Sequence, residues 1–166
     1  MLALLLLQKG AVSVAATDVE PRAVTCAKEN AQRFGVSDRL TVEERELFPD
    51  GKFDLVVCNP PWVPEPPKNR VDRAVFDEGH AMLDGFLSGL RAHLSKGGRG
   101  VLIISNLAEL LGLRTPTFLD EKFTEHGLRC TKKLEAWAKH GKAKDKSDPL
   151  HQARSKEITT LYVLEP

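Results

Sequence analysis

The sequence predicts an α/β fold with a mainly parallel sheet and an antiparallel C-terminal strand. Along most of the 166 residues, short apolar β-type runs alternate with amphipathic helical patterns, as in parallel strands joined by crossover helices. Two β-type runs in succession close the chain, which favours one antiparallel pairing. The length and the 42% hydrophobic content suit one compact core, so we predict a single domain over residues 1–166.

The first predicted element is a buried helix over residues 1–9, which Gly10 ends. Its leucine-rich run resembles the core of a signal peptide, but no basic residue precedes it and no small-residue cleavage site follows it. The run is also too short to cross a bilayer, because a spanning helix needs about 20 apolar residues. We therefore predict no membrane association.

Two strands and a helix are predicted next. A short apolar run at 12–16 is a buried strand that leads to Asp18. Pro21 suits the first turn of a helix that continues to Phe34. Residues 40–43 form the second strand.

The rest of the chain follows the same alternation. A strong strand at 53–57 is followed by a Pro-rich, charged loop at 64–74. An amphipathic helix over 77–94 stops before the turn residues 96–98. The remaining predicted elements are a strand at 101–104, helical pieces at 107–113 and 118–126, a strand at 128–137, a loop at 138–156 and a last strand at 157–164.

Charge is distributed unevenly along the chain. The net charge is +1, but residues 129–156, called the basic segment below, hold nine Lys and Arg against three Asp and Glu. Such a segment can meet phosphates or an acidic protein, and the alternative is an ordinary solvated loop.

The cysteines and histidines show no metal-ligand spacing. Cys26, Cys58 and Cys130 are far apart, and none has a Cys-x-x-Cys partner. We predict reduced, mostly buried thiols in a cytoplasmic protein, with no metal site.

Polar residues at strand ends are the candidates for function, because ligands of open α/β sheets bind beyond the carboxyl ends of the strands. Asp18 follows the first visible strand, where a carboxylate in dinucleotide-type folds accepts hydrogen bonds from a ribose about 20 residues after a glycine-rich loop. The alternative is a helix-capping or solvent-facing aspartate. Glu46 lies between two strands near the same edge, where the alternative is a surface glutamate.

The segment Asn59-Pro60-Pro61-Trp62, called the NPPW segment below, follows an apolar strand and combines an amide, two rigid prolines and a large aromatic ring. Prolines fix φ and lack an N–H donor, so the Asn59 and Pro60 carbonyls point in set directions with no local amide competing for them. The alternative is a proline turn beside a partly buried tryptophan.

This combination suits the methylation of a planar nitrogen. The lone pair of an amide or exocyclic amine is delocalised, so a site must accept the hydrogens of the nitrogen and aim its lone pair at a methyl donor. The Asn59 side-chain oxygen and the Pro60 carbonyl are candidate acceptors. Trp62 is a candidate stacking surface, a contact worth about 1–3 kcal/mol for a base.

Four segments carry a family resemblance: TDVEPRAV at 17–24, Asn30-Ala31, ELF at 46–48 and FDLVVCNPPW at 53–62. They resemble the small-domain class I S-adenosylmethionine-dependent methyltransferases, which have a Rossmann-like sheet. That group includes the glutamine methyltransferases of release factors and ribosomal protein, and the RNA and DNA methyltransferases of exocyclic amines in guanine and adenine.

The resemblance implies a cofactor and residue roles. The cofactor is S-adenosyl-L-methionine, Asp18 binds its ribose and Glu46 lies by its adenine. Asn59, Pro60, Pro61 and Trp62 hold the amino group that is methylated, and Asn59 is also counted among the cofactor-binding residues.

One part of the family pattern is not found. The first strand and its Asp-x-Gly-x-Gly-x-Gly loop are expected before residues 1–7, and the helix that follows the loop is present without it. We therefore expect Met1 to be internal to a longer reading frame and the first strand's neighbours to have open edges. Cofactor affinity should depend on that loop.

The leading interpretation is methyl transfer to a nucleic-acid base or to a protein glutamine. The alternative is a catalytically impaired methyltransferase-like module that binds a partner through the basic segment. A nicotinamide oxidoreductase would share the sheet but has no need of the NPPW segment. A base in a duplex would have to be flipped out to reach the site, whereas a glutamine on a loop would not. The basic segment mildly favours nucleic acid as the substrate.

Overall fold

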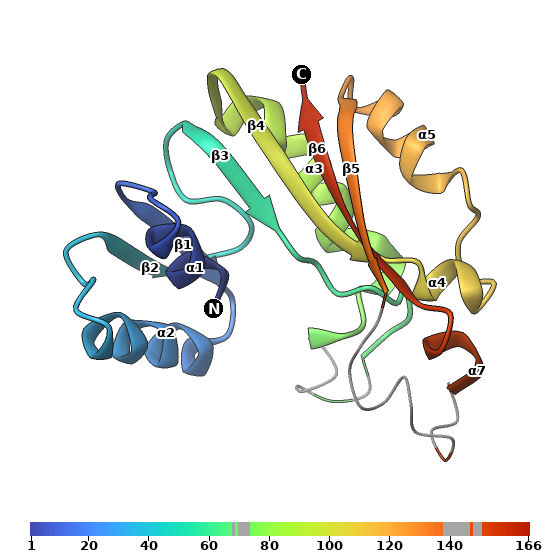
Figure 1. Ribbon diagram of the computed structural model, residues 1–166, viewed down its shortest axis with the longest axis horizontal. Coiled ribbons are helices and arrows are strands. Elements are labelled where there is room, and N and C mark those ends of the chain that lie inside the picture. Colours follow the sequence, from blue (N-terminus) through green and yellow to red (C-terminus); the bar gives the residue numbers. More distant parts are fainter. Residues whose placement is uncertain (68, 70–73, 138–146, 148–150) are drawn as a thin grey trace. The chain divides into compact units, whose positions relative to one another are not determined.

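The computed structural model describes residues 1–67, 69, 74–137, 147 and 151–166 (Figure 1). The chain forms two compact units, Met1–Gly51 and Lys52–Pro166, and each is described by itself. The single domain predicted over residues 1–166 stays a prediction.

The first unit contains two helices and a parallel pair of strands. Its elements are α1 (Leu2–Gln8), β1 (Val14–Asp18), α2 (Pro21–Arg33) and β2 (Leu40–Glu44). β1 and β2 pair in parallel from Val14 opposite Leu40 to Asp18 opposite Glu44. These elements confirm the predicted ones to within two residues at each end.

A small apolar core holds the first unit together. Leu7 of α1 packs with Val24 and Ala31 of α2 and with Leu40 and Val42 of β2. Each fully buried aliphatic side chain of the size of valine or leucine contributes about 1.5–3 kcal/mol. The helical period of α2 and the alternation of β2 therefore direct the apolar residues of both elements into this one core.

The second unit contains a four-stranded sheet. Its elements are β3 (Phe53–Cys58), η2 (Glu78–His80), α3 (Ala81–His93), β4 (Leu94–Ser105), α4 (Leu107–Leu110), α5 (Phe118–Glu125), β5 (Arg129–Trp137), α7 (His151–Arg154) and β6 (Ile158–Glu165). The strand order is β3-β4-β6-β5. β3 and β4 are parallel, and β6 is antiparallel to both of its neighbours. The predicted α/β class with an antiparallel last strand is confirmed.

Helices pack on the sheet of the second unit. In Figure 1, α3 lies behind β4 and β6, and α5 lies beside β5. Leu90 of α3 is fully buried and lies against Gly100 of β4. The ring of Phe123 in α5 meets the ring of Tyr162 in β6 edge-on, with 5.4 Å between their centroids. The apolar stripe of each helix therefore faces the sheet.

β4 is longer than the predicted strand at 101–104. It begins at Leu94, directly after α3, and includes the residues 96–98 that we predicted as a turn. Its pairing with β3 shifts register between Phe53 and Leu55. A Cβ on Gly98 would lie 2.8 Å from the Phe53 carbonyl oxygen, so glycine allows the close approach of these strands.

Two smaller predictions were wrong. The short helix α7 lies in the predicted loop at 138–156, most of which is outside the described residues. The three cysteines are free, but Cys26 is exposed and Cys130 is half-buried. Only Cys58 is the buried thiol that we predicted for most of them.

Each unit has two end strands with one partner among the described residues, β1 and β2 in the first unit and β3 and β5 in the second. β1 pairs with β2, and β3 pairs with β4, and neither has a second partner among the described residues. The predicted open edges beside the family's first strand stay a prediction, because all four end strands of the two sheets have a single partner among the described residues. No helix in the described part of the chain is long and apolar enough to span a membrane.

Candidate active site at the carboxyl ends of the strands

Asp18 ends β1 and is exposed. Its Oδ1 accepts a hydrogen bond of 2.8 Å from the Glu20 backbone N–H, which closes a tight turn before α2. No described residue donates a hydrogen bond to its other carboxylate oxygen. Asp18 is therefore solvent-facing, as one of the two alternative interpretations held, and closes a turn, whereas the N-cap of α2 is Glu20.

Glu46 lies in the loop that follows β2 and is exposed. This loop is tied to the end of β1, because the Thr17 hydroxyl donates to the Leu47 carbonyl and the Arg45 N–H donates to the Asp18 carbonyl over 3.1 Å. Leu47 has a positive φ of 55°, which is uncommon for a leucine and indicates a constrained loop. Asp18 and Glu46 thus belong to the same edge of the first unit.

The NPPW segment continues from the buried end of β3 in the second unit. Pro60 is fully buried and Asn59 is exposed. The backbone N–H groups of Trp62 and Val63 both donate to the Val75 carbonyl over 3.0 Å. Among the described residues, none donates a hydrogen bond to the Pro60 carbonyl.

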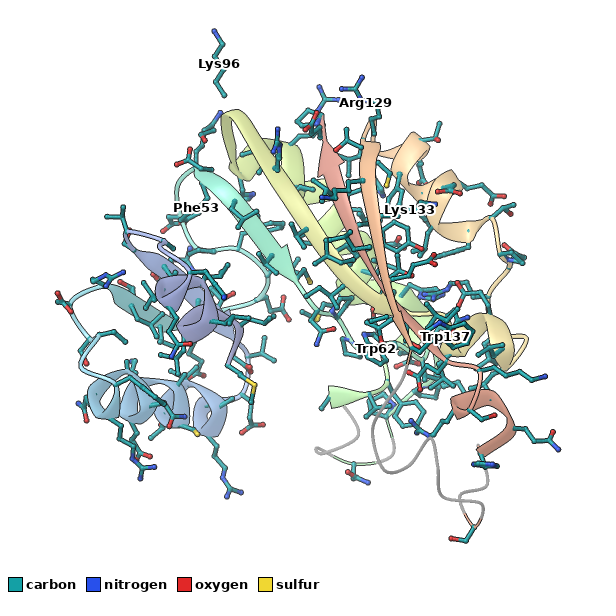
Figure 2. All side chains as sticks on the ribbon, viewed as in Figure 1. Phe53, Trp62, Lys96, Arg129, Lys133 and Trp137 are labelled. Carbon is teal, nitrogen blue, oxygen red and sulfur yellow. The ribbon has the colours of Figure 1, made fainter. Side chains whose placement is uncertain are left out.

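The Trp62 and Asn59 side chains are joined. The indole Nε1–H of Trp62 donates to Asn59 Oδ1 over 3.1 Å, and Trp62 is half-buried. In Figure 2, Trp62 and Trp137 lie at the edge of the sheet where β3 and β5 end, opposite the edge marked by Phe53 and Arg129. This is the carboxyl edge at which the ligands of open α/β sheets bind.

Asp77 is hydrogen-bonded to the chain on both sides, at the start of α3 and directly after the NPPW segment. It is buried, and its carboxylate accepts hydrogen bonds from the backbone N–H groups of Met82 at 2.8 Å and Leu83 at 3.1 Å. Its own N–H donates to the Val63 carbonyl over 2.8 Å. Asp77 therefore links the start of α3 to Val63, the residue that follows the NPPW segment.

Two groups near this edge have shifted pKa values. Burial, and then the negative charge of Asp77, raises the pKa of the Cys58 thiol to about 12. Burial, and then the positive charge of Arg114, lowers the pKa of His80, whose ring lies 4.5 Å from the ring of Phe118.

A second polar group lies at the end of β4. Ser105 donates to the buried Glu157 over 2.7 Å, and the buried Arg114 donates to the Ser105 carbonyl over 2.8 Å and to Glu109 over 2.8 Å. We did not single out these residues from the sequence. The same rule that selected Asp18 would have selected Ser105, because it directly follows the predicted strand at 101–104.

The structure therefore brings the four residues of the NPPW segment together in one unit, and Asp18 and Glu46 in the other. No group of three or more His, Cys, Asp or Glu able to hold a metal occurs in the described ranges.

The family described as "RMKL-like, methyltransferase domain" matches residues 6–127. The chain belongs to this methyltransferase family. The predicted class I methyltransferase resemblance is thus confirmed, and S-adenosyl-L-methionine is confirmed as the cofactor at the level of the family.

Curated relatives of this methyltransferase domain act on protein glutamine by name. A Methanocaldococcus jannaschii protein, provisionally named a protein N5-glutamine methyltransferase, is 35% identical over 108 residues, which are 60% of this chain and 54% of that one. The release factor glutamine methyltransferase of Moorella thermoacetica is 35% identical over 94 residues, 54% of this chain and 33% of that one. The chain therefore spans about half or less of the length of these relatives.

Solved structures share the fold of this methyltransferase domain. A ribosomal protein L11 methylase from Lactobacillus delbrueckii subsp. bulgaricus has a TM-score of 0.61 and 22% identity, over 99% of this chain and 63% of that one. A methyltransferase from Geobacter sulfurreducens, solved with S-adenosyl-L-homocysteine, has a TM-score of 0.57 and 18% identity, over 92% of this chain and 74% of that one. At these identities the likeness is one of fold.

Proposed function

We propose that this chain transfers a methyl group from S-adenosyl-L-methionine to the side-chain nitrogen of a protein glutamine. The observation that carries the proposal is the NPPW segment at the carboxyl end of β3, which presents an exposed Asn59 amide and a Pro60 carbonyl without a described partner. The named relatives support glutamine as the substrate class.

The two acceptors match the needs of a glutamine nitrogen. An amide N–H₂ has two hydrogens and a delocalised lone pair. When Asn59 Oδ1 and the Pro60 carbonyl accept those hydrogens, the nitrogen is held with its lone pair directed away from both oxygens. Positioning of this kind can lower a barrier by about 7–11 kcal/mol. Pro61 keeps the Pro60 carbonyl in place, and Trp62 offers a flat surface to the planar amide.

Asp18 and Glu46 are the residues that we assign to the cofactor, with Asn59 as a third contact. The exposed Asp18 carboxylate has one oxygen without a described donor, which fits a ribose hydroxyl, and Glu46 fits a position by the adenine. When bound, the cofactor supplies an electrophilic methyl group on a sulfonium sulfur. Asp18 and Glu46 would hold its nucleoside, and the NPPW segment would hold the acceptor nitrogen.

The test separates binding from transfer. The purified protein is incubated with methyl-labelled cofactor and cell extract, and the label is located in protein, RNA or DNA. We expect label in protein glutamine. Asn59→Ala should lower the transfer rate about a hundredfold or more, whereas Asp18→Ala should mainly weaken cofactor affinity in calorimetry, about tenfold or more. Absence of cofactor binding by the wild type would overturn the proposal.

A nucleic-acid substrate is the competing candidate, favoured by the basic segment. In the described part of that segment, two of the positive side chains lie near carboxylates: Lys133 lies 3.4 Å from Asp120, and Arg129 lies 3.4 Å from Glu165. Such pairs leave less free positive charge for phosphates. Label in RNA or DNA, with affinity that falls steeply with salt, would favour this candidate over glutamine. The cytoplasm is the compartment in which either substrate would be met.

A non-catalytic binding module is the remaining alternative. It predicts no methyl transfer by the wild type, together with partner binding that Asn59→Ala leaves intact. Both measurements come from the same set of purified proteins.

A further inference from the structure

Asn59 can serve as a hydrogen-bond acceptor only in one of its two amide orientations. Its side chain carries an oxygen on one side and an N–H₂ group on the other, and the two differ little in shape. If the Asn59 N–H₂ group faced the N–H₂ group of a glutamine, two hydrogen-bond donors would meet and no hydrogen bond could form. Something in the site has to select the other orientation, because Asn59 is exposed.

The Trp62 indole makes that selection. Its Nε1–H is a donor and never an acceptor, and it lies 3.1 Å from the Asn59 side chain. The group facing it must therefore be the oxygen. An amide oxygen has two lone pairs, so Oδ1 can accept from Trp62 and still accept from a substrate N–H.

The backbone at Trp62 is held in place by hydrogen bonds to the segment 75–77. The Trp62 and Val63 N–H groups bond to the Val75 carbonyl, Val63 is buried and pairs with Phe76 as an isolated bridge, and Asp77 bonds to the Val63 carbonyl. The backbone position of Trp62 is thus fixed, and its indole N–H is hydrogen-bonded to Asn59.

We propose that Trp62 is a positioning residue whose indole N–H locks the Asn59 carboxamide with its oxygen as the acceptor for the substrate amide. This inference rests on the proposed function of the NPPW segment. It gives Trp62 a role that a phenylalanine of similar flat shape could not fill, in addition to any stacking on the substrate. The rate of methyl transfer would then depend on the indole N–H of Trp62 as well as on stacking of the ring against the substrate.

The hydrogen bond can be tested without any activity. The chain has two tryptophans, so an NMR spectrum should show two indole N–H signals, which Trp62→Phe and Trp137→Phe assign. We expect Asn59→Ala to shift the Trp62 signal and to speed its exchange with water, while the signal of Trp137, a residue 66% exposed, stays unchanged. An unchanged Trp62 signal would overturn the proposal.

The positioning role is tested by kinetics on the same variants. Trp62→Phe keeps the aromatic face and removes the donor, so kcat should fall about two- to tenfold with an unchanged KM for S-adenosyl-L-methionine. The kcat of Trp62→Leu should be lower still, because this variant also loses the flat aromatic surface. Phe34→Leu, which removes an exposed ring at the end of α2 in the first unit, is the control and should match the wild type. Thermal unfolding followed by circular dichroism confirms that each variant is folded.

The outcomes separate the two proposals. A Trp62→Phe variant as active as the wild type, beside an impaired Trp62→Leu variant, would show that Trp62 acts by stacking alone and would overturn the positioning role. A wild-type chain that transfers no label in the experiment above would overturn the proposed function itself.

Discussion

At the residue scale, the neighbouring residues Cys58 and Asn59 differ in burial and therefore in reactivity. Cys58 is the last residue of β3 and is buried, whereas Asn59 is exposed at the carboxyl edge. Burial penalises the thiolate, and the nearby Asp77 carboxylate adds like charge, so the pKa of Cys58 rises to about 12. The thiol beside the NPPW segment is therefore a packing group and not a nucleophile.

We expect Cys58 to resist alkylation in the folded protein. Iodoacetamide at about pH 8 should modify the exposed Cys26 first, and Cys58 should react only after urea is added. Peptide mass spectrometry identifies the modified residue. Modification of Cys58 in the native protein at the rate of Cys26 would contradict its buried, protonated state.

At the element scale, the contact of α3 with β4 depends on a residue without a side chain. A Cβ on Gly100 would lie 2.4 Å from Leu90 Cδ2, and Leu90 is fully buried. The helix can lie close to the strand only because position 100 is glycine. The periodicity of α3 predicts which face is apolar, but the partner of Leu90 on the sheet is set by the register of β4.

We expect Gly100→Ala to lower the free energy of unfolding by about 1–3 kcal/mol, because the added methyl group overpacks the core. Urea denaturation measures the change. The double variant Gly100→Ala with Leu90→Ala should lose less than the sum of the two single variants, since the shortened side chain makes room for the methyl group. Strictly additive losses would argue against the contact.

At the scale of the whole molecule, polar groups from separate segments of the second unit meet around His80. Its ring lies against Phe118 of α5, and its charge environment includes Arg114, Asp77, Asp84 and Lys122. Burial and the Arg114 charge outweigh the two carboxylates, so the pKa of His80 lies below 6.5. His80 has a positive φ of 62°, which also ties it to one backbone conformation.

The folded chain should therefore lose stability as His80 takes up a proton. Because the pKa is lower in the folded than in the unfolded chain, the unfolded chain binds more protons below about pH 6.5. The contribution of His80 is complete above that pH and is lost as the pH falls through the folded pKa. Urea denaturation between about pH 7.5 and pH 5 measures this slope. His80→Asn, which tolerates a positive φ, should have a shallower slope than the wild type, and an equal slope would contradict the assignment.

The local patterns of the sequence determined most of the elements and the main candidate segment. Leu40 and Val42 alternate inward, α2 repeats its apolar residues at helical spacing and begins at Pro21, and these periods are properties of a few consecutive residues. The NPPW segment could be predicted as a site because two prolines and an amide at a strand end constrain the backbone locally.

Only the tertiary structure decided how distant segments meet. The sequence alone could not show that β4 begins at Leu94, because residues 96–98 resemble a turn and the pairing of Leu94 with Phe53 joins segments that are far apart in the chain. It could not show the capping of α3 by Asp77 or the bond from the Trp62 indole to Asn59. Such contacts depend on the direction of side chains across turns and on strand register, and a linear pattern of residue types encodes neither directly.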